Sequence, residues 1–262
     1  MRELPDYVSD PVYQFADDIT NSTTSNSLTN IENKLVENFL DIKSFCQDKD
    51  LRINVDKTQC MLLKLPTKKP GKDLELVLEN YNLKSSSSVE LLGLTIDQHL
   101  TFKQHIEKTV KKCHGVIGVI NRAKAVLPIP LRKLCFTALV RPHLEYCNLA
   151  LAGASKTNLI KLEIIQKIAS RIICGVEKDA HAEPLLNKLG LSTLKERREK
   201  KILKTVNAIL NGDCHPWLLD MFREDDYGLL TCNDTTRTTF GRKRFSFYAR
   251  MLYNSFLLEI QD

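Results

Sequence analysis

Residues 12–20 read Val-Tyr-Gln-Phe-Ala-Asp-Asp-Ile-Thr, and this stretch decides how the first part of the chain folds. Aromatic and β-branched residues flank the two aspartates, which favours a strand on each side of the acidic pair. The pattern predicts a β-hairpin with Asp17 and Asp18 at or near its tip. Because side chains alternate along a strand, we expect Asp17 on the face of Phe15 and Asp18 on the opposite face.

The adjacent carboxylates of Asp17 and Asp18 repel each other, and burying either one without a partner is costly. Two readings remain open. The pair is an exposed acidic turn, where Asp is favoured for its local backbone hydrogen bonds, or it binds a cation such as magnesium through one or two carboxylates. The Asp-rich helix of prenyl-diphosphate enzymes fits less well, because the neighbouring residues favour strands and no second Asp-rich motif follows.

Composition indicates an ordinary globular chain of 262 residues, 43% hydrophobic and 27% charged, with a mild net charge of +6. This excludes collagen-like, low-complexity and wholly disordered proteins. No apolar run approaches the roughly 20 residues of a membrane helix, and no secretion signal opens the chain. We therefore expect an intracellular protein, nuclear or cytoplasmic, without a membrane partner. The eight cysteines form no C-x-x-C pair, which favours reduced thiols over disulfides or zinc.

Between the hairpin and residue 100, short strands and one helix are expected. Apolar residues recur every three to four positions over residues 27–47, which predicts an amphipathic helix. Residues 51–55, 61–63 and 89–96 read as strands. A lysine-rich loop over residues 67–72 interrupts them.

The remaining chain reads as helical. One apolar stripe covers residues 106–120, a second helix runs from 131 to about 142, and a third is striped over 159–172. A fourth helix is expected over 192–210, with Thr193 suited to capping its first turn. Strand-rich and helix-rich regions together predict the α+β class.

Four short motifs follow one another along the chain: Phe15-Ala16-Asp17-Asp18, Asn54-Val55-Asp56-Lys57-Thr58, Leu92-Gly93-Leu94-Thr95-Ile96-Asp97 and Arg141-Pro142-His143-Leu144-Glu145-Tyr146. In this order they resemble motifs of the reverse transcriptases of non-LTR retrotransposons, the long interspersed and jockey-like elements. Each motif alone is weak, but four in the right order over most of the chain are specific. The distal region departs from the family, with Tyr253 in place of Trp and Phe256-Leu257 in place of Leu-Pro.

The resemblance implies an arrangement of domains. Residues 1–100 would form a partial polymerase palm, with a hairpin, a helix and further short strands. Residues 101–180 would form a helical thumb, and residues 181–262 a C-terminal helical and basic region.

The resemblance also implies roles for individual residues in RNA-directed DNA polymerisation. Asp17 would bind the magnesium ions that align a primer hydroxyl with a nucleotide phosphate, and Asp18 would support that metal site. Lys57 corresponds to a catalytic lysine near the triphosphate; its alternative is an ordinary surface lysine. Leu92 and Gly93 would grip the primer, where glycine allows close backbone approach; the alternative for Gly93 is a β-bulge.

Two basic regions suit an RNA template and a DNA primer as partners, because phosphates need cations and unpaired bases stack on aromatic rings. Their alternative is a solvated helix face with buried aromatics. The residues concerned are Lys103, Lys108, Lys111 and Lys112 on the predicted thumb helix, and Arg242, Lys243 and Arg244 in the tail.

One feature of the family is not matched. Its members carry a third catalytic aspartate on an earlier strand, whereas sixteen residues precede Asp17. We therefore expect a truncated reverse transcriptase that does not polymerise DNA by itself. A non-catalytic nucleic-acid-binding helical module derived from a retroelement, and a protein-interaction remnant, stay as alternatives.

Overall fold

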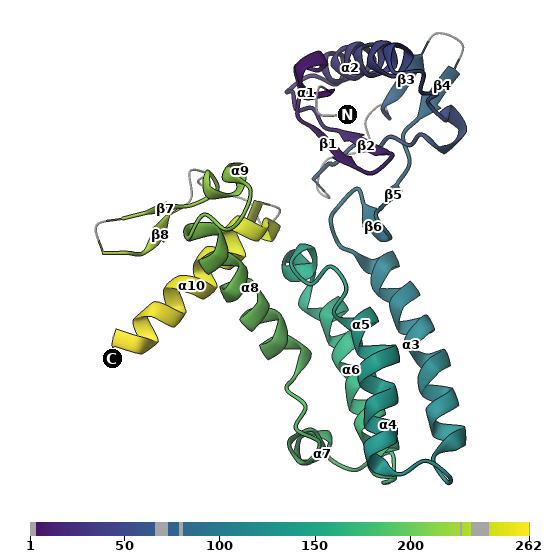
Figure 1. The fold of residues 1–262 in the computed structure, drawn as a ribbon, viewed down its shortest axis with the longest axis vertical. Helices are drawn as coiled ribbons and strands as arrows, with labels where there is room; N and C mark the ends of the chain where they lie inside the picture. The colour runs from purple at the N-terminus through teal and green to yellow at the C-terminus, as the bar shows by residue number, and fades with distance from the viewer. Residues whose placement is uncertain (1–3, 66–72, 79–80, 226, 232–240, 262) are drawn as a thin grey trace. The chain divides into compact units, whose positions relative to one another are not determined.

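The computed structural model describes residues 4–65, 73–78, 81–225, 227–231 and 241–261 (Figure 1). The chain divides into two compact units, Met1–Val89 and Glu90–Asp262. Helices combine with small two-stranded sheets, which agrees with the predicted α+β class. In the described part of the chain, no helix is long and apolar enough to cross a lipid bilayer. The division into a palm over residues 1–100, a thumb over residues 101–180 and a C-terminal region over residues 181–262 remains a prediction.

The first unit is built around one long helix. Its elements are α1 (Leu4–Tyr7), β1 (Val12–Phe15), β2 (Asp18–Asn21), α2 (Leu28–Asp48), β3 (Glu75–Leu78) and β4 (Tyr81–Lys84). The hairpin β1–β2 and the helix α2 confirm the two sequence predictions for this region. Leu28 and Phe39 of α2 pack against the β3–β4 cluster, whereas Phe45 packs with Leu4 and Ile19 beside β1–β2. One apolar stripe on α2 therefore supports both hairpins of the unit.

Two predicted strands in this unit are wrong. Residues 51–54 are irregular and lead into a 3-10 turn, Val55–Lys57, because the Asn54 side chain accepts a hydrogen bond from the backbone N–H of Lys57. Such local side-chain bonds compete with sheet pairing. Residues 61–63 are also irregular, and Leu62 is apolar because it packs against the β3–β4 cluster. The predicted loop over residues 67–72 lies outside the described residues.

The second unit is mainly helical (Figure 1). Its elements are β6 (Leu94–Asp97), paired with β5 (Ser88–Leu91) at the unit boundary, and α3 (Lys103–Ala123), α4 (Ile129–Cys135), α5 (Arg141–Leu144), α6 (Lys156–Cys174), α7 (Ala182–Lys188), α8 (Leu194–Leu210), α9 (Pro216–Leu219), β7 (Arg223–Glu224), β8 (Leu230–Thr231) and α10 (Phe245–Gln261). The four helices predicted from apolar periodicity are present. The single strand predicted over residues 89–96 is instead two strands joined by a two-residue turn, because Leu92 and Gly93 both have positive φ.

Helix ends in this unit follow the local sequence. Thr193 and Glu196 form a reciprocal capping box at the start of α8, and Gly175 ends α6 with φ of 71°. Between α4 and α5 the helix widens into a π turn, Phe136–Val140. There the N–H of Arg141 donates to the carbonyl of Phe136, and Pro142 has no N–H to continue the α-helical pattern.

Two hydrophobic clusters hold the second unit together. In the first, α3 and α6 lie side by side and pack with the π turn, burying Ile106, Val140 and Ile165. The second joins α8 and α10 and buries Val206 and Ala249. The first cluster also includes Leu94 of β6, so the β5–β6 hairpin is anchored on α3.

The cysteines in the described part of the chain are free thiols. Cys113 is fully buried on the inner face of α3, and burial raises the pKa of its thiol to about 11. A buried thiol that stays protonated packs like a small apolar side chain and is a poor nucleophile.

Candidate functional site

The acidic pair lies at the tip of the β1–β2 hairpin. Phe15 pairs with Asp18, so Ala16 and Asp17 form the two-residue turn, and the side chains of both aspartates are exposed. The expected faces are wrong in one respect. Because Phe15 and Asp18 are directly opposite each other in an antiparallel pair, they share a face. The prediction assumed that side chains alternate between the two faces without interruption from Phe15 to Asp18. Ala16 and Asp17 form a turn instead, so this alternation does not continue through them.

The base of this hairpin is fixed by a buried polar side chain. Asn38 of α2 is 2% exposed, and its amide donates to the carboxylate of Asp10 at 2.9 Å and to the side-chain oxygen of Asn21 at 3.1 Å. Asp10 precedes β1 and Asn21 ends β2, so one side chain ties together both ends of the hairpin. The hydrogen bond from Asn38 lowers the pKa of Asp10.

Lys57 ends the 3-10 turn that follows Asn54, and its side chain is exposed. The Asn54 carbonyl also accepts a hydrogen bond from the Thr58 hydroxyl at 3.0 Å. The Asn-x-x-Lys-Thr motif is therefore explained locally, because its first and last residues close the turn that presents the lysine.

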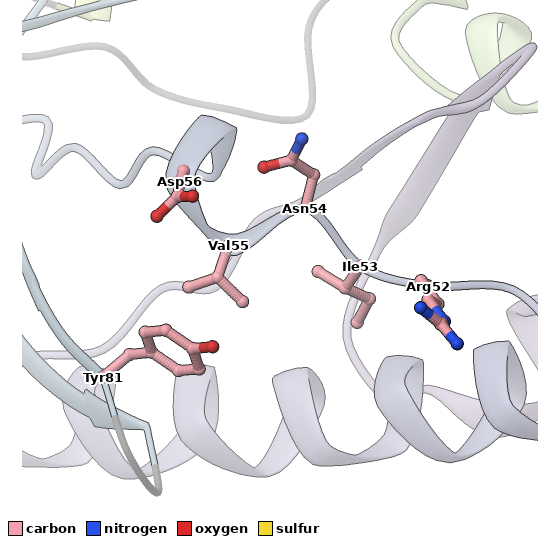
Figure 2. Close-up of a pocket in the computed structure, with 6 residues that line it drawn as sticks. All are labelled: Arg52, Ile53, Asn54, Val55, Asp56 and Tyr81. Atoms are coloured by element: carbon pink, nitrogen blue, oxygen red, sulfur yellow. The ribbon is translucent and has the colours of Figure 1, made fainter.

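A cavity of about 360 Å³ lies beside this turn. Figure 2 shows the residues that line it: Arg52, Ile53, Asn54, Val55, Asp56 and Tyr81. Tyr81 comes from the start of β4, and the others come from the turn and the segment before it. The lining thus includes one basic and one acidic residue, whereas the amide oxygen of Asn54 is turned to the backbone N–H of Lys57.

Asp17, Asp18 and Lys57 belong to the same unit, but within the described residues no hydrogen bond or ion pair joins their side chains. The described residues also contain no group of three or more His, Cys, Asp or Glu side chains arranged to hold a metal ion. One or two carboxylates with water and phosphate oxygens suffice for a single magnesium ion. Holding two ions needs further ligands.

The turn of the β5–β6 hairpin brings Leu92 and Gly93 to its tip, with φ of 48° and 78°. This is the pair of left-handed residues that a tight hairpin turn requires. Gly93 thus occupies a turn and not a bulge. The hydroxyl of Tyr146, from the segment after α5, donates a hydrogen bond to the carbonyl of Leu92.

Asp97 fixes the connection between β6 and α3. Its carboxylate accepts hydrogen bonds from the N–H groups of His99, Thr101 and Phe102 and from the Thr101 hydroxyl. In the first turn of α3, His105 is buried, and its Nδ1 accepts a hydrogen bond from the N–H of Thr95 in β6. Burial lowers the pKa of His105. In the Leu-Gly-x-x-Ile-Asp motif, Leu92 and Gly93 therefore form the hairpin turn, and Asp97 accepts the backbone N–H groups that precede α3.

The four lysines of α3 have different environments. Lys103, Lys111 and Lys112 are exposed, and no acidic partner lies within 4 Å of them in the described part of the chain. Lys108 instead reaches back to β5 and β6, where it contacts Glu90 at 3.5 Å and the Thr95 hydroxyl at 3.1 Å. Lys103, Lys111 and Lys112 are therefore the α3 cations available to a phosphate backbone.

In the tail, the basic residues lie around the start of α10. Arg242 and Arg244 are exposed, whereas the side chain of Lys243 lies outside the described part of the structure. Aromatic residues alternate with these basic residues. Two of them, Phe245 and Tyr248, pack against the hydrophobic cluster of α8 and α10, so their rings contribute to the core. The guanidinium of Arg250 lies 5.2 Å from the centre of the Phe247 ring.

Sequence reasoning missed Asn38 and Tyr146. Asn38 lies on the apolar stripe of α2, three residues after Leu35 and four before Ile42, where a polar residue is unusual. A polar residue at an apolar position of the helix was therefore a signal in the sequence that could have identified Asn38. Tyr146 was part of a motif, but its contact with Leu92 spans 54 residues and follows from no local pattern.

Comparison with known proteins gives one informative similarity. The related protein is an RNA-directed DNA polymerase of a transposon. It is the probable RNA-directed DNA polymerase from transposon BS of Drosophila melanogaster, 26% identical over 187 residues. The match covers 70% of this chain and 20% of that protein, so the chain spans about a fifth of the length of its relative. No family model and no solved structure matches the chain. The similarity supports a relationship with reverse transcriptases.

Proposed function

We propose that this chain is a palm and thumb portion of a retrotransposon reverse transcriptase and that it binds a primer–template duplex. The observation that carries the proposal is the similarity to a transposon RNA-directed DNA polymerase over 70% of the chain. The ordered motifs agree with it. Asp17 and Asp18 are at an exposed hairpin tip, and Leu92 and Gly93 form the tip of a second hairpin.

Asp17 and Asp18 are the residues that would hold magnesium in this proposal. Magnesium would supply the activation of the attacking oxygen and the stabilisation of the leaving oxygen during nucleotidyl transfer. Two exposed carboxylates are a donor set that a single magnesium ion accepts when water or phosphate oxygens complete its ligands. A second ion requires a further carboxylate, so we propose that the chain alone binds nucleic acid without polymerising DNA.

A non-catalytic nucleic-acid-binding module is the second candidate. The exposed lysines of α3 favour it, because Lys103, Lys111 and Lys112 can contact phosphates without any contribution from the acidic hairpin. In this case, substitution of Asp17 changes neither binding nor its magnesium dependence.

The test uses an RNA template annealed to a DNA primer with a recessed 3′ end. We expect binding of the purified chain, measured by fluorescence anisotropy, to weaken steeply as salt rises from about 50 to 200 mM. Affinity without salt dependence, or no binding at all, would contradict nucleic-acid binding. We expect magnesium to increase affinity for the wild type but not for Asp17→Asn/Asp18→Asn.

Polymerisation is tested separately with the same duplex and deoxynucleotides. We expect no incorporation by the chain alone, and incorporation when a second polypeptide supplies a further carboxylate ligand. Incorporation by the chain alone that is lost in Asp17→Ala would overturn the expected inactivity but would support the polymerase relationship.

A further inference from the structure

The tip of the β5–β6 hairpin has a conformation that its sequence does not favour on its own. Leu92 has φ of 48°, a left-handed value that places a branched side chain in a region favourable mainly to glycine. Its side chain is also 44% exposed, so core packing does not hold this residue in place. Some other contact must stabilise the turn.

Tyr146 provides that contact. Its hydroxyl donates to the carbonyl of Leu92, and its ring lies against Gly93. A Cβ atom added at Gly93 would lie 3.6 Å from the Tyr146 Oη and 3.8 Å from Cε1. One side chain therefore touches both central residues of the turn.

Tyr146 is itself held in place from both sides. Its neighbour Glu145 forms a two-point ion pair with Arg197 of α8, in which Nη2 and a carboxylate oxygen are 3.0 Å apart. The ring of Tyr146 also lies 6.5 Å from the ring of His105, which accepts a hydrogen bond from Thr95 in β6. The segment after α5 is thus joined to the hairpin at its tip and along β6.

We propose that Tyr146 is a positioning residue that fixes the Leu92–Gly93 turn for contact with a primer strand. This inference rests on the proposed function, because it assumes that the turn meets nucleic acid. Tyr146 acts on the turn and need not touch the nucleic acid itself. Its loss leaves the number of cations unchanged but lets the turn leave its left-handed conformation.

The first experiment tests the contact without nucleic acid. Tyr146→Phe removes only the hydroxyl, which bonds to the Leu92 carbonyl and to the Cys147 thiol. We expect amide hydrogen exchange at residues 92–94 to become about fivefold faster, in keeping with the loss of the bond to Leu92. Tyr227→Phe is the matched control, because Tyr227 is 83% exposed and its hydroxyl has no hydrogen bond in the described structure. Unchanged exchange in Tyr146→Phe would overturn the proposal.

The second experiment tests positioning. We expect Tyr146→Phe to weaken binding of a recessed primer–template about fivefold and of a blunt duplex less than twofold. The slope of log affinity against log salt should not change, because no phosphate contact is lost. Faster exchange with unchanged primer–template affinity would overturn the positioning role.

A second variant keeps the proposal testable if Tyr146→Phe folds poorly. Gly93→Ala strains the same turn from the opposite side, since its φ is 78°. We expect a similar loss of primer–template affinity, and a double variant no worse than the stronger single one, because the two changes disturb one structure. Fully additive losses would contradict a shared turn. If the wild type binds no duplex, the proposed function fails, while the exchange experiment still decides whether Tyr146 holds the turn.

Discussion

The carboxylate of Asp97 accepts a hydrogen bond from the backbone N–H of Phe102 at 2.6 Å, across the five residues that join β6 to α3. Phe102 has φ of 55°, so it cannot cap the helix with an extended backbone. Asp97 takes over the capping role from five residues away. These bonds close the connection between the β5–β6 hairpin and α3, the basic helix of the proposed nucleic-acid interface.

We expect Asp97→Ala to lower the free energy of unfolding of the second unit by about 3 kcal/mol, because several hydrogen bonds to one carboxylate are lost together. Urea denaturation followed by the fluorescence of Trp217, the single tryptophan of the chain and a residue of this unit, measures the change. Asp213→Ala is the control, since Asp213 is exposed. An equal effect of both substitutions would contradict the capping role.

His105 should make the second unit sensitive to mild acid. Burial lowers its pKa below the ordinary value of 6.5, and the nearby Lys108 acts in the same direction while Glu90 opposes it. The unfolded chain therefore binds a proton first as the pH falls below about 6.5. Stability is fully present above that value and decreases as the pH falls toward the lowered pKa.

The measurement is urea denaturation between about pH 7.5 and 5. His105→Asn keeps an acceptor near the position of Nδ1 but cannot titrate, so we expect a flatter dependence on pH for this variant. The same slope in both proteins would show that His105 does not cause the acid sensitivity.

Asn38 should control the order of the acidic hairpin. We expect Asn38→Leu to destabilise the first unit by about 2 kcal/mol, because it removes a buried donor and leaves Asp10 and Asn21 without their shared partner. Amide hydrogen exchange over residues 10–21 should increase. Asn33→Leu, an exposed position on the same helix, is the control. Protection of the hairpin in Asn38→Leu equal to that in the control would refute this role.

Ala16 carries strain at the tip of the same hairpin, with φ of 53°. We expect Ala16→Gly to stabilise the hairpin by about 0.5–1 kcal/mol, since glycine adopts this conformation without a Cβ penalty. Slower amide exchange of β1 and β2 would report it. Ala208→Gly is the comparison. Because Ala208 lies within helix α8, glycine there should destabilise the second unit. Faster exchange at the hairpin of Ala16→Gly would be the contrary result.

The exposed lysines of α3 should account for part of the salt dependence of binding. For each of Lys111→Ala and Lys112→Ala, we expect the slope of log affinity against log salt to become shallower by about 0.9. Lys84→Ala is the control, because Lys84 lies in the first unit and forms an ion pair with Glu75. A slope that is unchanged in both α3 variants would exclude this face of α3 from the interface.

Several local features were predictable because the interactions that cause them are local. The alternation around Asp17 and Asp18 predicted a hairpin, and the stripe of α2 predicted a helix. The strand predicted over residues 51–55 failed because one side chain, Asn54, closes a turn that β-propensity does not register. The strand over residues 89–96 failed because an apolar run conceals the turn at Leu92 and Gly93.

By itself, the sequence determined the class of fold, the main helices, the acidic hairpin and a resemblance confined to short motifs. Each of these depends on residues a few positions apart, where periodicity and capping act. Only the tertiary structure decided that Asn38 holds the hairpin base and that Tyr146 holds the turn at Leu92. These contacts join residues far apart in the chain, and their free energy exists only once packing has brought the elements together.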